Sequence, residues 1–394
     1  MLTGLRVLDL TNVLAGPFCC HQLAHFGADV IKVEVPGRGD LARQLGADSD
    51  LNAASMGISF LAQNAGKRSI TLNLKHPKGK ALLTRLVKEA DVLVENFRPG
   101  VMDRLGVGWE VLKAENPKLV YCAISGFGQD APWAQRPAYD QIIQGASGVM
   151  SITGGVETAP QRVGYPVADT IGGLTAAMAI CAALNNREEG AFIDVSMLES
   201  VLATMGWVVS NWLIGGVEPK PQGNENPTSA PSGAFATADK LLNIAANKQE
   251  QWLSLTDHLG RQELAEDPRF KTREDRKANR FDLKVELEKT LATKPAATWA
   301  DEFNALGVPA GVIMDVPDIL DDALIQTRGM LAHFAKTPGV DRPITVLRTG
   351  VKVDGEAPAV DTPPPALGEH NDEVYATLGI TSEELESLKQ EGIV

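Results

Sequence analysis

The feature that most constrains the fold is the alternation of short apolar segments with amphipathic helical segments in the first half of the chain. Segments with the length and apolar content of buried strands lie at residues 5–10, 29–34, 68–74, 91–97, 119–127 and 192–197. Helical patterns lie at residues 17–27, after Pro77, and at residues 170–186. This alternation predicts a parallel sheet with helices on both faces, which binds ligands at the carboxyl ends of its strands.

The length of the chain and a change in its composition predict two domains. A chain of 394 residues exceeds what one ordinary hydrophobic core supports. Residues 214–232 are rich in Gly, Pro, Asn and Ser, which is typical of a linker. We therefore expect an α/β fold with a Rossmann-like parallel sheet in a large domain over residues 1–213, completed by residues 326–394. A smaller α+β domain is expected over residues 233–325.

Charge and composition narrow the classes of partner. A net charge of −13 disfavours nucleic acid and anionic membranes, so an anionic ligand needs a local group of cations. The N-terminal segment lacks the pattern of a secretory signal, and no apolar segment reaches membrane-spanning length. Four cysteines are too few for a disulfide framework in so long a chain. We expect a soluble, cytoplasmic protein.

Sequence motifs of several common enzyme classes are missing. The turn at residues 11–17 reads Thr-Asn-Val-Leu-Ala-Gly-Pro instead of a dinucleotide-binding Gly-x-Gly-x-x-Gly, and there is no phosphate-binding loop that ends in Gly-Lys-Ser/Thr. A dehydrogenase and a nucleotide hydrolase are therefore disfavoured. Cys19, Cys20 and His21 are consecutive, so they point in different directions on a helix. Without a second pair of ligands, they predict no metal site.

Asp169 allows two interpretations. It precedes Gly172 and Gly173 at the start of the predicted helix 170–186. An aspartate there is commonly an N-cap, and on the local sequence alone the cap is favoured. Asp169 is alternatively a nucleophilic carboxylate. In that case the helix dipole keeps it ionised, and the two glycines let an acyl group approach the backbone.

Several segments together carry a resemblance to a known family. They lie at residues 12–17, 67–75, 95–100, 104–106, 126–128, 138–140 and 167–169. The segment Val-Glu-Asn-Phe-Arg-Pro-Gly at residues 94–100 is the most specific of these. In order and spacing, the chain resembles the class III CoA-transferases over essentially its whole length. That family includes formyl-CoA transferase, carnitine CoA-transferase and the 2-methylacyl-CoA racemases.

The resemblance implies a site and a reaction. Asp169 matches the family's catalytic aspartate, which forms an aspartyl anhydride and an aspartyl-CoA thioester while CoA moves between acids. The implied donor is succinyl-, acetyl- or formyl-CoA, and the acceptor is a small carboxylate or dicarboxylate such as oxalate. CoA is then a substrate, and no tightly bound cofactor is implied. The implied CoA contacts are Val13, Leu14, Ala15, Leu72, Lys75, Asn96, Phe97, Arg104, Leu105 and Tyr139. Lys75 and Arg104 suit the phosphates of CoA. The resemblance also implies a homodimer of interlocked, ring-shaped chains.

Departures from the family pattern bear on the substrate. Val35 stands where the family often has Arg beside the adenine, so Arg38 or Arg43 is a candidate replacement. Pro137 replaces a Lys of formyl-CoA transferase, and residues 227–235 lack the glycine run of that enzyme. These departures favour acetyl-CoA or succinyl-CoA as donor over strict specificity for formyl-CoA and oxalate.

Alternative functions remain open on the sequence. A racemase needs a second acid/base, a His in a Gly-His-Asp segment, and residues 138–140 read Ala-Tyr-Asp here. A CoA-binding protein without catalysis is a second alternative, and a thioesterase that uses water as acceptor is a third.

Overall fold

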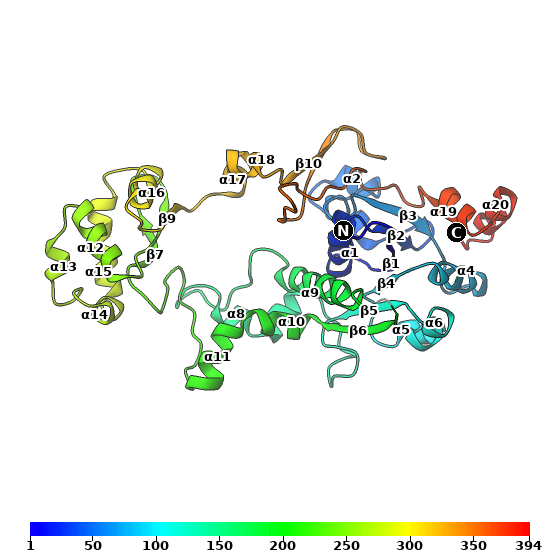
Figure 1. Cartoon of the computed structure of the whole chain (residues 1–394), viewed down its shortest axis with the longest axis horizontal. Helices are drawn as coiled ribbons and strands as arrows, with labels where there is room; N and C mark the ends of the chain where they lie inside the picture. The colour runs from blue at the N-terminus through cyan, green and yellow to red at the C-terminus, as the bar shows by residue number, and fades with distance from the viewer. Residues whose placement is uncertain (187) are drawn as a thin grey trace. The chain divides into compact units, whose positions relative to one another are not determined.

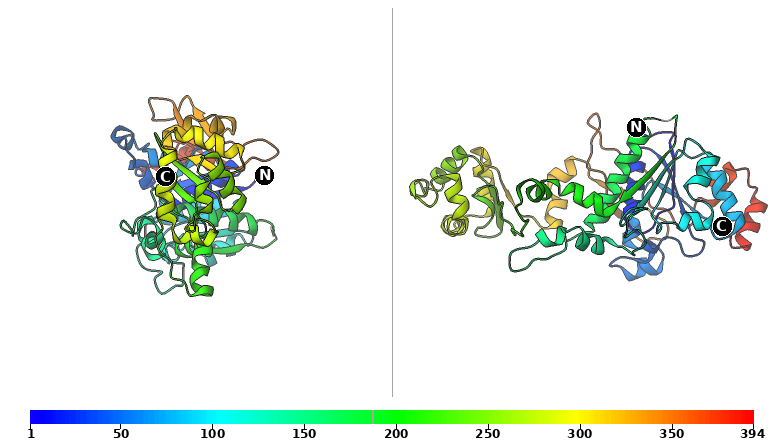
Figure 2. Two further views of the ribbon diagram at one scale, coloured as in Figure 1. Left: turned by 90° about the vertical axis from the view of Figure 1, so that its left-hand side faces the viewer. Right: turned by 90° about the horizontal axis from the view of Figure 1, so that it is seen from below.

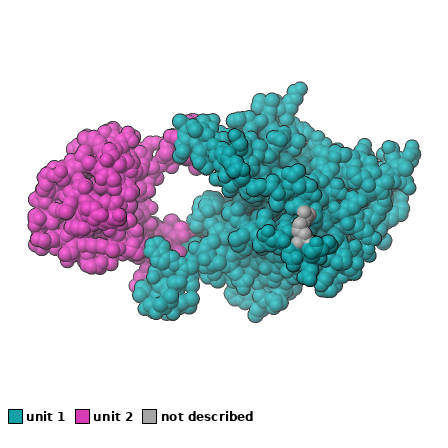
Figure 3. Space-filling view, in the orientation of Figure 1, with its two compact units in different colours: residues 1–149, 162–218, 323–394 teal, residues 150–161, 219–322 magenta. Residues whose placement is uncertain are grey.

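The chain forms two compact units, which are coloured separately in Figure 3. The computed structural model describes residues 1–186 and 188–394. Unit 1 comprises Met1–Val149, Arg162–Glu218 and Ala323–Val394, and unit 2 comprises Met150–Gln161 and Pro219–Asp322. Residues 150–161, which we expected in the large domain, group with unit 2 because the Gly223 N–H donates to the Gly154 carbonyl at 2.9 Å.

The centre of unit 1 is a six-stranded parallel sheet in the order β3-β2-β1-β4-β5-β6 (Figure 1). Its strands are β1 Arg6–Asp9, β2 Asp29–Glu34, β3 Lys67–Thr71, β4 Val92–Glu95, β5 Val120–Ser125 and β6 Ala191–Ser196. The sheet confirms the predicted α/β architecture, and each strand begins and ends within three residues of its predicted segment. The strand order reverses between β1 and β4, where doubly wound sheets bind their ligands.

Helices cover both faces of this sheet, because successive side chains of each buried strand point to opposite sides. Val7 packs against α1 and α9, whereas the adjacent Leu8 packs on the other side with α4, α6, α19 and α20. Figure 2 (right) shows the strands between these helices. The helices of unit 1 are α1 Ala15–His25, the 3₁₀ helix η1 Leu41–Gln44, α2 Ser49–Ala53, α3 Ile58–Leu61, α4 Pro77–Lys88, α5 Val101–Leu105, α6 Trp109–Glu115, α7 Asp140–Ala146, α9 Val167–Ala183, α10 Met197–Thr204, α11 Gly206–Gly215, α18 Ala323–Thr327, α19 Asn371–Thr377 and α20 Ser382–Gln390.

A small antiparallel sheet completes unit 1. It is formed by strands β10 Leu331–Phe334 and β11 Ile344–Leu347. The chain passes from unit 1 to unit 2 within the short helix α8 Val149–Ile152, which belongs to unit 2 from Met150 onward.

Unit 2 is a small α+β unit. Strands β7 Ser232–Ala236, β8 Leu241–Ala245 and β9 Ala310–Val312 form an antiparallel sheet in that order. Its core contains Trp252, Phe270 and Phe303. The helices are α12 Gln249–His258, α13 Glu263–Glu266, α14 Arg273–Ala278, α15 Arg280–Leu291, α16 Ala296–Ala305 and α17 Val316–Asp321.

The apolar helices raise the question of a membrane span. In the part of the chain that the structure describes, no single helix combines the length and apolar character needed to cross a membrane. The same described residues contain one pair, α10 and α11, that meets those criteria when taken together, and the two helices are bent by 75° relative to one another. Helix α11 is notable for its exposure: Trp207, Trp212, Leu213 and Ile214 are all exposed.

Candidate active site

A cavity of about 620 Å³ lies at the carboxyl edge of the parallel sheet in unit 1. Its walls come from the segments that follow β1, β2, β4, β5 and β6, and from the start of α9. This is the position where sheets of this type bind ligands. The lining residues are Asn12, Val13, Leu14, Ala15, Val35, Arg38, Gly39, Leu41, Gln44, Asn96, Phe97, Arg98, Pro99, Ile124, Ser125, Gly126, Ala134, Arg136, Pro137, Ala138, Tyr139, Asp169 and Met197.

Asp169 lies in the first turn of α9, which begins at Val167, three residues earlier than expected. Its side chain does not cap the helix, so the cap interpretation is wrong. The cap comes from another segment: the Asp140 Oδ1 atom accepts the N–H of Ala168 at 2.8 Å and that of Asp169 at 3.5 Å. Within residues 1–186 and 188–394, no protein group donates a hydrogen bond to the Asp169 carboxylate. That carboxylate therefore faces the cavity without a hydrogen-bond donor from the described protein.

The electrostatic environment of Asp169 differs from the expected one. Burial, and then the nearby Asp140 carboxylate, raise the pKa of Asp169 to about 7. Asp140 is itself buried, and its Oδ2 atom accepts a hydrogen bond from Gln144 Nε2 at 2.7 Å. The helix dipole, which we expected to keep Asp169 ionised, is outweighed by these two effects. Near neutral pH the free protein therefore holds Asp169 about half protonated.

The glycines after Asp169 serve helix packing instead of leaving room for an acyl group. A Cβ atom on Gly173 would lie 2.5 Å from the Ala15 carbonyl oxygen, and one on Gly172 would lie 2.9 Å from Met197 Cγ. Both glycines are buried. The expectation that they admit the acyl group is therefore wrong, because protein atoms already fill that space. Gly173 brings α9 close to the first turn of α1, and Gly172 brings α9 close to Met197 at the start of α10.

The cavity brings together most of the residues implied by the family resemblance. Val13, Leu14, Ala15, Asn96, Phe97 and Tyr139 line the same cavity as Asp169. Among residues 1–186 and 188–394, no side chain caps the first turn of α1, so its N–H groups are free to meet a ligand.

The other four implied residues lie outside the cavity lining. Leu72 is buried in the core just after β3, and Leu105 packs against that core from α5. Lys75 and Arg104 are exposed.

Three other cations line the cavity: Arg38, Arg98 and Arg136. Arg38 was one of two candidates to replace the residue at Val35. The other, Arg43, is buried and paired with Glu34 at 2.7 Å, so it is not available to a ligand. We did not single out Arg98 or Arg136, although Arg98 lies within the recognised segment 94–100 and Arg136 directly precedes Pro137.

The described residues contain no group of three or more His, Cys, Asp or Glu side chains placed to hold a metal ion. The four cysteines are free thiols. Among the described residues, the charged groups that line the cavity are therefore the Asp169 carboxylate and three arginines, and they lie beside backbone from the turn after β1.

Comparison with known proteins identifies the family. The sequence model of CoA-transferase family III matches residues 2–371. An acetyl-CoA:oxalate CoA-transferase of Acetobacter aceti is 43% identical over 344 residues, which cover 86% of this chain and 87% of that protein. A succinate–glutarate CoA-transferase of Agrobacterium fabrum is 38% identical over 390 residues, which cover 96% and 95%. The crystal structure of a CAIB/BAIF family protein from Brucella suis superposes with a TM-score of 0.83 at 36% identity, covering 96% of this chain and 99% of that one.

The fold, the cavity and these similarities agree on one class of enzyme. The chain belongs to CoA-transferase family III. It is an enzyme that transfers CoA between carboxylic acids, with CoA thioesters as substrates.

Proposed function

We propose that the enzyme moves CoA from an acyl-CoA donor to a small carboxylate or dicarboxylate, with Asp169 as the covalent nucleophile. The donor is succinyl-, acetyl- or formyl-CoA. The observation that carries this proposal is the Asp169 carboxylate, which has no protein donor within the described residues and lines the same cavity as residues 12–15. A free carboxylate in a cavity is suited to attack on an acyl group.

The proposed reaction has four covalent steps. A carboxylate oxygen of Asp169 attacks the thioester carbonyl of the donor, which breaks the C–S bond and gives an aspartyl anhydride and CoA thiolate. The thiolate attacks the aspartyl carbonyl, which releases the donor acid and leaves an aspartyl-CoA thioester. The acceptor carboxylate attacks that thioester and gives a new anhydride and thiolate. The thiolate finally attacks the acceptor's acyl carbon, which forms the new acyl-CoA and restores Asp169.

The raised pKa of Asp169 suits this chemistry. An aspartate with an ordinary pKa is a weak base and a weak nucleophile, whereas one with a pKa of about 7 is more basic and is still half ionised at neutral pH. The burial that raises this pKa also limits access of water, which would hydrolyse the anhydride and the thioester.

Charges in and beyond the cavity support anionic substrates. Arg38, Arg98 and Arg136 line the cavity of a protein whose net charge is −13. They are suited to the carboxylate of the acceptor and to the phosphates of CoA. Lys75 and Arg104, exposed beyond the cavity, are proposed contacts for the phosphates, with Leu72 and Leu105 beside them. The acids in the names of the two relatives, oxalate and glutarate, guide the choice of acceptors to test.

Two rival functions make different predictions. A 2-methylacyl-CoA racemase needs a second acid/base, and no histidine is among the residues that line the cavity within the described chain. A racemase would exchange the α-proton of a branched acyl-CoA with deuterium from the solvent, and we expect no exchange. A CoA-binding protein without catalysis would keep its function when Asp169 is replaced by Ala.

We also propose that the enzyme is a homodimer. Helix α11 exposes Trp207, Trp212, Leu213 and Ile214, and an exposed apolar surface of this kind is typical of a protein interface. A second copy of the chain is the partner that the family resemblance implies.

The proposed function is tested by mass-spectrometric detection of new CoA thioesters. The protein is incubated with succinyl-, acetyl- or formyl-CoA and with oxalate, glutarate, malate or mesaconate, and the Asp169→Ala variant is the control. We expect a new thioester that the variant does not form. A new thioester formed equally by the variant would exclude Asp169 as the nucleophile. Release of free CoA without any acceptor would identify a thioesterase.

A further inference from the structure

The turn after β1 contains a strained residue in the wall of the cavity. Val13 has φ = 68°, in the left-handed region that β-branched residues rarely adopt. Such a conformation is unfavourable and persists only where the surrounding structure enforces it. Val13 lines the cavity beside Leu14 and Ala15. The left-handed conformation of Val13 therefore shapes the surface on which we propose that CoA lies.

A buried carboxylate holds this strained peptide in place. The Asp40 Oδ1 atom accepts the N–H of Val13 at 2.9 Å and the N–H of Ala42 at 2.9 Å. Asp40 is only 1% exposed. Burial alone would raise the pKa of Asp40, but Lys32 and the two N–H groups outweigh it and hold that pKa below its ordinary value. Asp40 therefore remains ionised and binds the Val13 amide as a strong acceptor.

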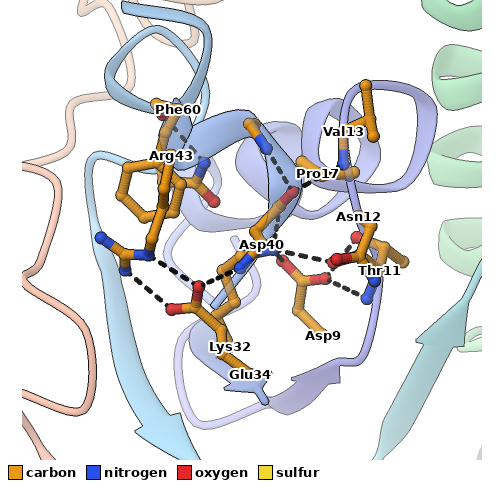
Figure 4. Close-up of polar contacts among 12 residues, drawn as sticks. Asp9, Thr11, Asn12, Val13, Pro17, Lys32, Glu34, Asp40, Arg43 and Phe60 are labelled. Carbon is orange, nitrogen blue, oxygen red and sulfur yellow. Dashed lines mark hydrogen bonds and ion pairs between the residues drawn. The ribbon is translucent and has the colours of Figure 1, made fainter. Parts of the chain in front are cut away.

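A buried cation holds the same turn one peptide earlier. Lys32 Nζ lies 2.9 Å from Asp40 Oδ2 and donates to the Thr11 carbonyl oxygen, also at 2.9 Å. Lys32 has no solvent exposure and is at the limit of ion-pair distance, 4.0 Å, from Asp9. Figure 4 shows Lys32 and Asp40 beside the turn, with their contacts to Thr11 and Val13. Lys32 and Asp40 thus fix the backbone on both sides of Asn12.

Further buried groups keep Asp40 in position. The Glu34 carboxylate accepts the Asp40 N–H at 2.9 Å and binds Arg43 at 2.7 and 2.8 Å. Arg43 stacks on Phe60, with its Cζ atom 3.7 Å from the ring centroid (Figure 4). It also donates to the Pro365 carbonyl at 3.2 Å. Asp40 is therefore part of a continuous buried network, and its geometry is set by more than its own segment.

We propose that Asp40, together with Lys32, is a positioning residue that keeps Val13 in its left-handed conformation and thereby sets the affinity of the enzyme for CoA. The inference rests on the proposed function, in which residues 13–15 contact CoA. Asp40 itself is not among the residues that line the cavity. It acts through the backbone of Val13, and its replacement should change binding of CoA more than the chemistry at Asp169.

The test is calorimetric titration of the full-length protein with CoA, combined with KM and kcat for an acyl-CoA donor. The Asp40→Asn variant keeps the shape of the side chain but loses its charge. Release of strain of the size found at such sites corresponds to a Kd for CoA that is about 10- to 100-fold higher. We expect KM for the donor to rise in parallel and kcat to change much less.

A second substitution separates positioning from general structural damage. Gly adopts the left-handed region without strain, so in Val13→Gly this backbone conformation depends less on Asp40. In the Asp40→Asn background, Val13→Gly should recover most of the lost affinity. The matched control is Asp48→Asn, because Asp48 also accepts backbone N–H groups and pairs with Arg342, but it does not line the cavity. The control should bind CoA normally.

The outcomes distinguish the inference from the proposed function. Unchanged CoA affinity in Asp40→Asn, or a double variant no better than Asp40→Asn alone, would overturn the inference. If Asp40→Asn does not fold, Val13→Pro replaces it, because Pro fixes φ near −65° and lacks the N–H group. Normal CoA binding by a folded Val13→Pro variant would likewise overturn the inference. Absence of CoA binding by the original protein would reject the proposed function instead.

Discussion

The raised pKa of Asp169 predicts that this residue destabilises the folded protein at alkaline pH. An unperturbed aspartate has a pKa of 3.8, whereas Asp169 in the folded protein has a pKa of about 7. The unfolded chain therefore releases this proton at a lower pH than the folded chain does. Stability falls as pH rises between these two values, and the loss is complete above about pH 7.

The size of this effect follows from the two pKa values. At 1.36 kcal/mol for each pKa unit, the raised pKa of Asp169 lowers the free energy of unfolding by about 4 kcal/mol at pH 8 and by about 2 kcal/mol at pH 5. Partial contact of Asp169 with solvent makes these values upper limits. Asp169→Asn removes the titrating group and nearly keeps its shape. This variant should therefore be more stable than the original protein, and more so at pH 8 than at pH 5.

The assay is urea unfolding at pH 5 and pH 8, followed by circular dichroism. The control is Asp50→Asn, which changes an exposed aspartate in the first turn of α2. The control should show no gain in stability that grows with pH. Equal stabilisation by Asp169→Asn at both pH values, or destabilisation at pH 8, would refute the assigned pKa and its origin in burial and Asp140.

Three further predictions concern the reaction, the helix packing and the assembly. The rate of CoA transfer should rise with pH through about 7 as Asp169 ionises. In Asp140→Asn this rise should move to lower pH, because a neighbouring negative charge is lost. The measurement is the pH–rate profile of both proteins, and identical profiles would contradict the prediction. Gly173→Ala should destabilise the protein by about 1 to 3 kcal/mol, because the new Cβ atom meets the backbone of Ala15. Gly206→Ala should not destabilise it, because a Cβ atom there meets no atom within 4 Å. Thermal melting compares the two variants, and equal effects would contradict the packing role of Gly173. Ile214→Asp should shift the protein from dimer to monomer, because it places a charge on the exposed apolar surface of α11. Analytical ultracentrifugation measures this shift, and an unchanged dimer would mean that the interface lies elsewhere.

The parallel sheet was predictable because its signals are local. A strand that is buried on both faces is a short, mostly apolar segment, and β4 and β5 have this character, whereas β6 at the sheet edge exposes Phe192 and Asp194. The turns between them lack dinucleotide and P-loop motifs, and the resemblance carried by segments such as residues 94–100 indicated the CoA-transferase family, which the family comparison confirms.

The start of α9 was not predictable from its own residues. Asp169 is a favourable N-cap in sequence, but the helix begins earlier because Asp140 supplies the capping carboxylate. Those two residues are far apart in the chain, and only the fold brings them together. Burial, and then this Asp140 carboxylate, raise the pKa of Asp169, so the ionisation of this residue was equally beyond local reasoning.

The buried ion pairs could not be predicted from the sequence either. Arg43 was a reasonable candidate for a ligand contact, because most arginines are exposed. In the structure, Glu34 and Phe60 enclose it, and Arg38 lines the cavity instead. The left-handed conformation of Val13 had no sequence signal either, since the residue type argues against it.

The central claim is that Asp169 carries CoA covalently during the reaction. The most direct test is to incubate the enzyme with succinyl-CoA or acetyl-CoA, trap the aspartyl thioester with hydroxylamine, and locate the hydroxamate by peptide mass spectrometry. We expect the hydroxamate on Asp169, with none formed in the absence of acyl-CoA. Turnover without a trapped intermediate at Asp169, or a hydroxamate on another carboxylate, would contradict the proposed mechanism.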